Sequence, residues 1–307
     1  MSPEALSGEP APPPAASSAV SAARVELPRL PGTPELTAEG DYRFAGGGLE
    51  VVLSKQLGFQ IQRLALDGRS CLVDFEEVSA LPAAGSAEPS LATIALSHET
   101  EVEGSTLVVR VKSTDDSFRL TRRYRIDTAR RALEITYGIE NAGKAPLSLT
   151  TREFWRVPRS DGFFFLPIVK GVAEPKATLK LNVWQSLLWL GPEATRGKPA
   201  SGVVYASEPW AANVSRGLLL VRTFGDMPRA EPGFPIGVEL LAGAERGGPP
   251  APAAEQMKLS VESARLALKP GEKLSFTTRW LVRQLPSSIA VKAGNPELLG
   301  FVRGVIQ

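Results

Sequence analysis

The chain has 307 residues, of which 43% are hydrophobic and 22% charged, and its formal net charge is +2. Acidic residues are interspersed with the basic ones and no run of 18 apolar residues occurs, so neither nucleic-acid binding nor a membrane span is expected. The single cysteine, Cys71, and the single histidine, His98, exclude an intramolecular disulfide and a zinc site made from a Cys and His cluster. We therefore predict no metal and no other cofactor, and we interpret Cys71 as an inert core residue.

Residues 1–38 are rich in Pro, Ala and Ser and have no apolar periodicity. Such a segment buries too little surface to offset the entropy lost on ordering, so a disordered arm is predicted there. A single domain is expected at 39–286, followed by a C-terminal tail at 287–307, the only place where a helix is expected. We interpret the arm as the linker left after removal of a secretion or lipoprotein signal, which predicts a periplasmic or extracellular protein with a lipid anchor on its native precursor. The alternative is the natural tail of a cytosolic protein.

From Leu49 onward, apolar residues recur with a period of two, which is typical of β-strands that have one wet face. The strands are expected at 49–53, at 59–66 before the turn Asp67-Gly68, and at 91–97, 106–111, 118–126, 202–206, 217–224, 235–241, 257–268 and 274–284. The proline-rich stretch 247–254 is interpreted as a surface insertion.

The segment 133–149 predicts a β-hairpin. Apolar residues alternate over 133–139, the turn residues Asn141 and Gly143 follow, and Leu147 and Leu149 continue the alternation. No interval between strands provides an amphipathic helix long enough for a parallel crossover. We therefore predict an all-β fold, a large antiparallel β-sandwich.

Several segments, taken in chain order, resemble the galactose-mutarotase-like β-supersandwich proteins: the strand 58–64 with its Asp67-Gly68 turn, the strand 118–126 and the Asn141 hairpin. Within that fold the chain resembles an uncharacterised bacterial family, whose members share a Trp with a basic r-v-p element and an aromatic run, a late v-E-l strand, an l-x-P-G-e turn and a final Trp-bearing strand. The matching segments are 154–165, 237–241, 268–272 and 279–281, so the resemblance covers about residues 45–285. It implies a supersandwich fold and, by analogy with that fold, carbohydrate chemistry.

The resemblance also implies candidate catalytic positions. A mutarotase moves protons at the sugar ring oxygen and at the anomeric hydroxyl, with a histidine and a glutamate as acid and base. Glu239 stands where the late-strand glutamate is expected, and the alternative for Glu239 is a strand carboxylate paired with an arginine. The histidine position holds Arg152 or a neighbour, and arginine does not release its proton. His98 lies in a different strand and is interpreted as a solvated or core-edge residue.

Aromatic side chains supply faces on which sugar rings pack. Trp184, Trp189 and Trp280 are expected in the core, whereas Trp155 and Trp210 adjoin polar residues. We therefore predict a binding site for a carbohydrate or sugar-like small molecule, formed by Arg152, Glu153, Trp155, Arg156 and Trp210.

The leading hypothesis is a carbohydrate-binding supersandwich protein that is non-catalytic or catalytically altered. One alternative is an active sugar epimerase or mutarotase, or a glycoside hydrolase with a pair of carboxylates. Another is a periplasmic protein-interaction scaffold, because a related supersandwich serves as a domain of a membrane-protein insertase. A concave face that gathers Arg152, Glu153, Trp155, Trp210 and Glu239 would favour the sugar hypotheses, and a flat face would favour the scaffold.

Overall fold

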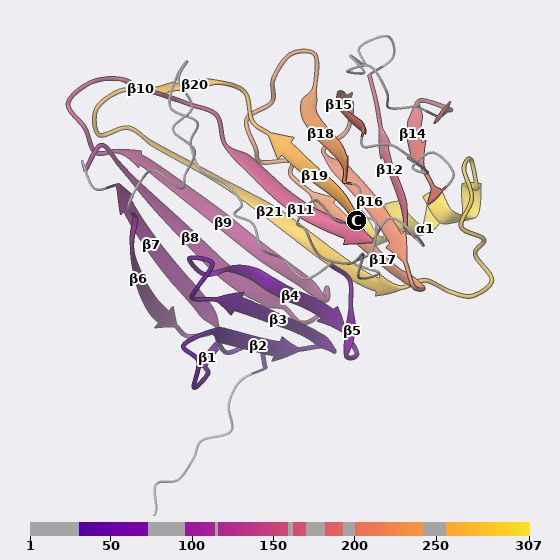
Figure 1. Ribbon diagram of the computed structural model, residues 1–307, viewed down its shortest axis with the longest axis horizontal. Helices are drawn as coiled ribbons and strands as arrows, with labels where there is room; N and C mark the ends of the chain where they lie inside the picture. The colour runs from indigo at the N-terminus through magenta and orange to yellow at the C-terminus, as the bar shows by residue number, and fades with distance from the viewer. Residues whose placement is uncertain are drawn as a thin grey trace, which may run out of the picture.

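The described part of the chain is built almost entirely from antiparallel β-strands (Figure 1). The computed structural model describes residues 31–72, 96–113, 116–158, 162–169, 182–192, 200–241 and 256–307. A large sheet forms one layer of a sandwich and smaller sheets form the other, which confirms the predicted all-β fold with a large antiparallel sandwich. Within the described ranges, no helix is long and apolar enough to cross a membrane.

A ten-stranded sheet runs through the whole molecule (Figure 1). In spatial order its strands are β13 (Asn182–Trp184), β14 (Leu187–Leu190), β12 (Phe163–Pro167), β16 (Trp210–Ser215), β17 (Leu218–Thr223), β21 (Lys273–Gln284), β9 (Ala132–Asn141), β8 (Phe118–Asp127), β7 (Thr106–Ser113) and β6 (Leu96–Glu103). The period-two pattern of β9 sends Leu133, Ile135 and Tyr137 to the inner face of this sheet, where each is at most 3% exposed.

Two smaller sheets cover this inner face, as Figure 1 shows. The five-stranded sheet contains β1 (Glu35–Leu36), β2 (Tyr42–Gly46), β3 (Leu49–Ser54), β4 (Gln60–Leu66) and β5 (Arg69–Ser70). The four-stranded sheet contains, in spatial order, β11 (Arg152–Pro158), β19 (Gln256–Glu262), β18 (Phe234–Leu241) and β15 (Ala200–Ala206). The main hydrophobic core lies between these two sheets and the ten-stranded sheet, and it includes Val51, Ile135 and Leu259.

Helix α1 (Pro296–Ile306) lies on the other face of the ten-stranded sheet, in the tail where a helix was expected. The Asn295 side chain caps it by accepting a hydrogen bond of 3.0 Å from the Glu297 backbone N–H, and Pro296 suits the first turn because its missing N–H would have no partner there. Leu298 and Val302 of the helix are buried in a second, smaller core, where they pack against β12, β14, β16 and β17.

The predicted hairpin at 133–149 is wrong. Strand β9 pairs with β8 and β21, whereas β10 (Leu147–Leu149) pairs with the distant β20 (Leu266–Leu268). The Asn141 side chain stabilises the pairing of β10 with β20, since its amide donates to the carbonyls of Ala145 and Leu268 at 2.9 and 2.8 Å. The turn residues therefore mark a crossing between sheets rather than a reversal within one sheet.

Three other local predictions differ from the structure. The strand expected at 257–268 is split into β19 and β20, with Ser263 between them donating its backbone N–H to the Thr151 carbonyl. The strand expected at 91–97 continues as β6 to Glu103, while residues 91–95 lie outside the described residues. Trp184 is 56% exposed instead of buried, because β13 is the edge strand of the ten-stranded sheet.

The predicted domain boundaries stay predictions. Residues 1–30 of the expected arm and the expected insertion at 247–254 lie outside the described residues. Strand pairing begins at Glu35, within the segment predicted as the arm, and the tail packs on the domain through α1.

Candidate functional site

Strand β11 sends its residues alternately to the two faces of the four-stranded sheet. Arg152, Phe154 and Arg156 are partly exposed on the outer face, whereas Glu153 and Trp155 are buried on the inner face. This division follows from the period of two in a β-strand. The predicted ligand-binding residues of this segment therefore lie in two different environments.

The outer face is organised around the ring of Phe154. We call it the Phe154 face, and it comprises Arg152, Phe154, Arg156, Glu239, Lys258 and Glu262. The Arg152 guanidinium lies 5.6 Å from the centre of the Phe154 ring, and the Lys258 ammonium lies 4.8 Å from it. The strand register places Arg156, Lys258 and Glu239 opposite one another, in one row across β11, β19 and β18.

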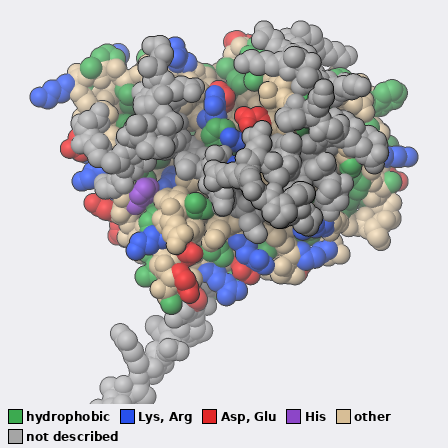
Figure 2. All heavy atoms as spheres, in the orientation of Figure 1, with side chains coloured by type: hydrophobic (Ala, Val, Ile, Leu, Met, Phe, Trp, Pro, Cys, Tyr) green, Lys and Arg blue, Asp and Glu red, His purple; other side chains and the backbone are tan. Residues whose placement is uncertain are grey.

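Opposite charges are paired across this face. Arg152 lies 2.6 Å from Glu262, and Lys258 lies 3.8 Å from Glu239, whose side chain is 49% exposed. Figure 2 looks onto this side of the molecule, and basic, acidic and hydrophobic side chains are visible together over the region where Figure 1 draws β11 and β19. The face thus presents an aromatic ring beside charged hydrogen-bond donors and acceptors, the groups that hold a polar ligand with an apolar ring face.

The structure brings the candidate base and the candidate acid position onto the same face. Glu239 and Arg152 both point outward from the four-stranded sheet, with β19 between their strands. Each is in an ion pair, Glu239 with a lysine rather than with the arginine considered from the sequence. No histidine lies beside them, because the only histidine of the chain is on β6.

The inner face places Glu153 in a buried polar cluster. Its carboxylate accepts hydrogen bonds from the hydroxyls of Tyr137 and Thr278 and pairs with Arg222. The side chains of Glu153 and Arg222 are each 1% exposed. Burial, followed by the nearby Glu153, raises the pKa of Tyr137 well above its ordinary value, and burial lowers the pKa of Arg222 despite the same carboxylate.

Trp155 belongs to this buried cluster and not to an exposed site. The Arg222 guanidinium lies between two indoles, 4.0 Å from the Trp155 ring centre and 4.2 Å from that of Trp280. Trp155 is 1% exposed. Neither Trp155 nor Glu153 presents a surface that a ligand could contact in this structure.

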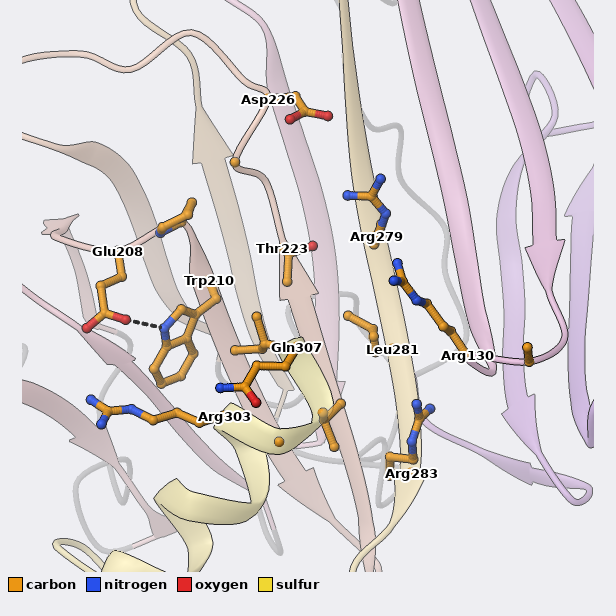
Figure 3. Close-up of a pocket in the computed structure, with 16 residues that line it drawn as sticks. Arg130, Glu208, Trp210, Thr223, Asp226, Arg279, Leu281, Arg283, Arg303 and Gln307 are labelled. Atoms are coloured by element: carbon orange, nitrogen blue, oxygen red, sulfur yellow. Dashed lines mark hydrogen bonds between the residues drawn. The ribbon is translucent and has the colours of Figure 1, made fainter.

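Trp210 lies at a third place, on the other face of the ten-stranded sheet. It borders a pocket of about 620 Å³ beside the C-terminal end of α1, which we call the α1 pocket. Figure 3 shows Glu208 and Trp210 on one side of it and the guanidinium groups of Arg279, Arg130 and Arg283 along the other. Trp210 is 4% exposed, and its indole N–H donates to the Glu208 carboxylate at 3.0 Å.

The expectation that Arg152, Glu153, Trp155, Trp210 and Glu239 gather on one concave face is therefore wrong. Arg152 and Glu239 share the Phe154 face, Glu153 and Trp155 lie in the core, and Trp210 lies in the α1 pocket. The sequence reasoning also missed Phe154, Lys258 and Glu262. The alternation of side chains along a strand could have identified them, because residues next to a buried strand residue in sequence point to the opposite, exposed face.

The two other residues of chemical interest lie apart from the Phe154 face. His98 packs its ring edge-on against Phe59 at 6.1 Å, and burial together with the neighbouring Arg122 lowers its pKa. Cys71 is buried, and burial raises the pKa of its thiol to about 12, as expected for an inert core cysteine.

No protein-family model matches the sequence, and no curated protein is significantly similar to it. Solved structures match the fold. A candidate aldose 1-epimerase from Escherichia coli K12 has 13% identity and a TM-score of 0.54, with 80% of this chain and 99% of that chain covered. A galactose mutarotase-like protein from Clostridium acetobutylicum has 10% identity and a TM-score of 0.54, with 82% and 98% covered. Another galactose mutarotase-like protein, from Lactobacillus casei, has 10% identity and a TM-score of 0.53, with 80% of this chain and 100% of that chain covered.

The chain has the galactose mutarotase-like fold. This confirms the resemblance found in the sequence motifs. At such low identity the likeness concerns the mutarotase-like fold alone, and function has to be argued from the residues of this chain.

Proposed function

We propose that this protein binds carbohydrate on the Phe154 face and that it is non-catalytic or catalytically altered. The observation that carries the proposal is the pairing of the Phe154 ring with Arg152 and Lys258, at 5.6 and 4.8 Å, on a sheet of the mutarotase-like fold. A sugar ring can pack its CH face on Phe154 while its hydroxyls meet the flanking charged groups.

The proposed loss of catalysis follows from proton chemistry. Anomerisation needs one group that donates a proton and another that accepts one, positioned on either side of the anomeric centre. A guanidinium group holds its proton too tightly to act as a general acid, so an arginine at this position can bind an oxygen atom but not donate a proton to it efficiently. Its position on the Phe154 face beside Glu262 is one that suits ligand binding.

A binding screen tests the first half of the proposal. Monosaccharides, including glucose and galactose, are titrated by calorimetry and by thermal shift, since a ligand that binds only the folded state raises the melting temperature. For any sugar that binds, we expect Phe154→Ala to weaken affinity by about 2- to 12-fold, the equivalent of the 0.5–1.5 kcal/mol that aromatic contacts supply.

Phe301→Ala is the matched control, because Phe301 is also partly buried but lies on α1 at the opposite face of the molecule. It should leave sugar affinity unchanged. Binding that Phe154→Ala does not alter, or that Phe301→Ala alters equally, would contradict the assignment to the Phe154 face.

Polarimetry or exchange NMR on a fresh anomer tests the second half. We expect no acceleration of glucose or galactose anomerisation by the purified protein. Acceleration that Glu239→Gln abolishes would show that Glu239 acts as a base and would overturn the non-catalytic assignment.

A periplasmic or extracellular location with a lipid anchor is a separate proposal. It is supported by the Pro- and Ala-rich composition of residues 1–38, which is typical of a linker. Fractionation of cells that express the native precursor tests it, and recovery from the cytosol would contradict it.

A further inference from the structure

The α1 pocket is built on a row of residues that crosses the ten-stranded sheet. Trp210, Thr223 and Arg279 lie opposite one another on β16, β17 and β21, and Leu281 and Arg283 follow on the same face of β21. Helix α1 covers the neighbouring part of this face with Leu298 and Val302 but ends at Ile306. The end of the helix therefore leaves part of the sheet open as a pocket.

Cationic groups gather on one wall of the α1 pocket. Figure 3 shows the guanidinium of Arg130 between those of Arg279 and Arg283. Arg279 shares its carboxylate partner, Glu134, with Arg125, so two guanidinium groups face one negative charge. Arg283 donates to the backbone carbonyls of Arg131 and Val282, at 3.3 and 2.8 Å, and these carry no full charge.

The charge on this wall is incompletely balanced by the described residues. Burial and the neighbouring Arg131 lower the pKa of Arg283, while the Asp127 carboxylate, which accepts a hydrogen bond from the Arg130 backbone N–H at 2.9 Å, acts in the opposite direction. Among the described residues, Arg130 has no carboxylate partner within salt-bridge distance. An anionic group placed between Arg130 and Arg283 would gain charge-assisted hydrogen bonds with both.

The opposite wall has different chemistry. The Trp210 indole and the Glu208 carboxylate lie there, joined by their hydrogen bond of 3.0 Å, with Arg303 beside them and Asp226 at the rim (Figure 3). This wall therefore holds one guanidinium and the carboxylate of Glu208, whereas the first wall holds three guanidinium groups. Carboxylates accept hydrogen bonds from hydroxyl groups and repel anions. The two walls together favour a ligand with a negative charge at one end and hydroxyl groups at the other.

We propose that the α1 pocket binds a hydroxylated organic anion of monosaccharide size, with its carboxylate or phosphate between Arg130 and Arg283 and its hydroxyl groups toward Glu208. The volume of 620 Å³ lies within the 300–1,000 Å³ that is usual for small-molecule sites. The pocket and the Phe154 face lie on opposite sides of the sandwich, so the inference does not depend on the proposed function.

Calorimetric titrations with glucuronate, glucose 6-phosphate, glucose and inorganic phosphate test this proposal. We expect one or both charged sugars to bind, more weakly as salt rises, and glucose to bind at least about tenfold more weakly because it lacks the charged group. Preference for glucuronate assigns a carboxylate to the ligand, and preference for glucose 6-phosphate assigns a phosphate. Inorganic phosphate that binds as tightly as both sugars would overturn the proposal, since the Glu208 wall would then contribute nothing.

Two variants and a control locate the binding. Arg130→Glu, at an exposed turn, should lower the affinity for the charged sugar by at least about tenfold, and Arg283→Ala should lower it similarly. Arg119→Ala is the control, because Arg119 is an exposed arginine on β8 that pairs with Glu140 outside the pocket. The Phe154→Ala variant should bind the charged sugar unchanged. Failure of both charged sugars to bind, or binding that Arg130→Glu leaves intact in a folded variant, would overturn the proposal.

Discussion

The buried pair of Glu153 and Arg222 provides the strongest test of how this sandwich is held together. Both side chains are 1% exposed, and the Arg222 guanidinium is stacked between Trp155 and Trp280 at 4.0 and 4.2 Å. Glu153→Gln keeps the shape of the side chain and an oxygen that can accept from Tyr137 and Thr278. It removes the charge that balances Arg222 and turns the oxygen that accepts from Arg222 into an amide donor.

We expect this single change to destabilise the protein by about 3–5 kcal/mol, the cost of leaving one buried charge without its partner. At roughly 2–4 °C per kcal/mol for a domain of this size, the melting temperature should fall by about 6–20 °C. Denaturant unfolding, followed by circular dichroism and by tryptophan fluorescence, measures the free energy of unfolding. The fluorescence should also change in the native state, because the altered group lies next to the two stacked indoles.

The double variant Glu153→Gln with Arg222→Met separates charge from packing. If the two charges are coupled, the double variant should cost about 1–3 kcal/mol less than the sum of the two single variants. A cost below about 1 kcal/mol for Glu153→Gln would refute the assignment of a dry, charged pair, because surface and water-screened pairs fall in that range. Additive single costs would refute it as well.

Two further predictions concern His98 and Ile135. In NMR, the ring of His98 should titrate with a pKa below the ordinary value of 6.5, because burial and Arg122 disfavour the charged ring. The free energy of unfolding should therefore decrease as the pH falls below 6.5. A pKa at or above 6.5 would contradict the packing of His98 against Phe59. Ile135→Ala should cost about 2–5 kcal/mol in denaturant unfolding, since Ile135 is 1% exposed in the main core, and a cost below about 1 kcal/mol would contradict its burial.

The sequence predicted the strands better than their partners. The period-two pattern located β3, β4, β7, β8 and β21 because alternation is a local property of each strand. It could not reveal that β10 pairs with β20, since the turn residues after β9 fit a hairpin equally well and the competing contact from Asn141 reaches Leu268, 127 positions away. Contacts at such separation depend on topology, which local turn chemistry does not encode.

The prediction of the candidate site from the sequence was wrong for a related reason. In sequence, Trp155 stands among the polar residues Glu153 and Arg156, which favours a ligand-facing side chain. In the strand, the immediate neighbour Arg156 points to the opposite face, and Glu153, two positions before Trp155, is buried beside it on the same face. Glu153 pairs with Arg222, 69 positions away, and no local sequence pattern predicts this pairing. Phe154, with charged residues two positions before and after it, had the pattern of an exposed aromatic residue among polar ones.

Under the proposed function, the Phe154 face binds a ligand on a mutarotase-like fold without catalysing anomerisation. Binding requires a ring, donors and acceptors at fixed positions. Phe154 supplies the ring, Arg152 and Lys258 supply donors, and Glu239 and Glu262 supply acceptors. Catalysis additionally requires groups that change their protonation state near neutral pH, and a guanidinium at the acid position does not. Arg152→His should place a titrating group on the same face as Glu239, four residues along β11 from the row of Glu239, without disturbing the sheet, since the residue is partly exposed and its main-chain pairing with Glu262 is unaffected by the side chain. Polarimetry on a fresh anomer measures the result: acceleration by this variant would identify Arg152 as the residue that prevents catalysis, and its absence would show that the replacement of this one residue is not sufficient.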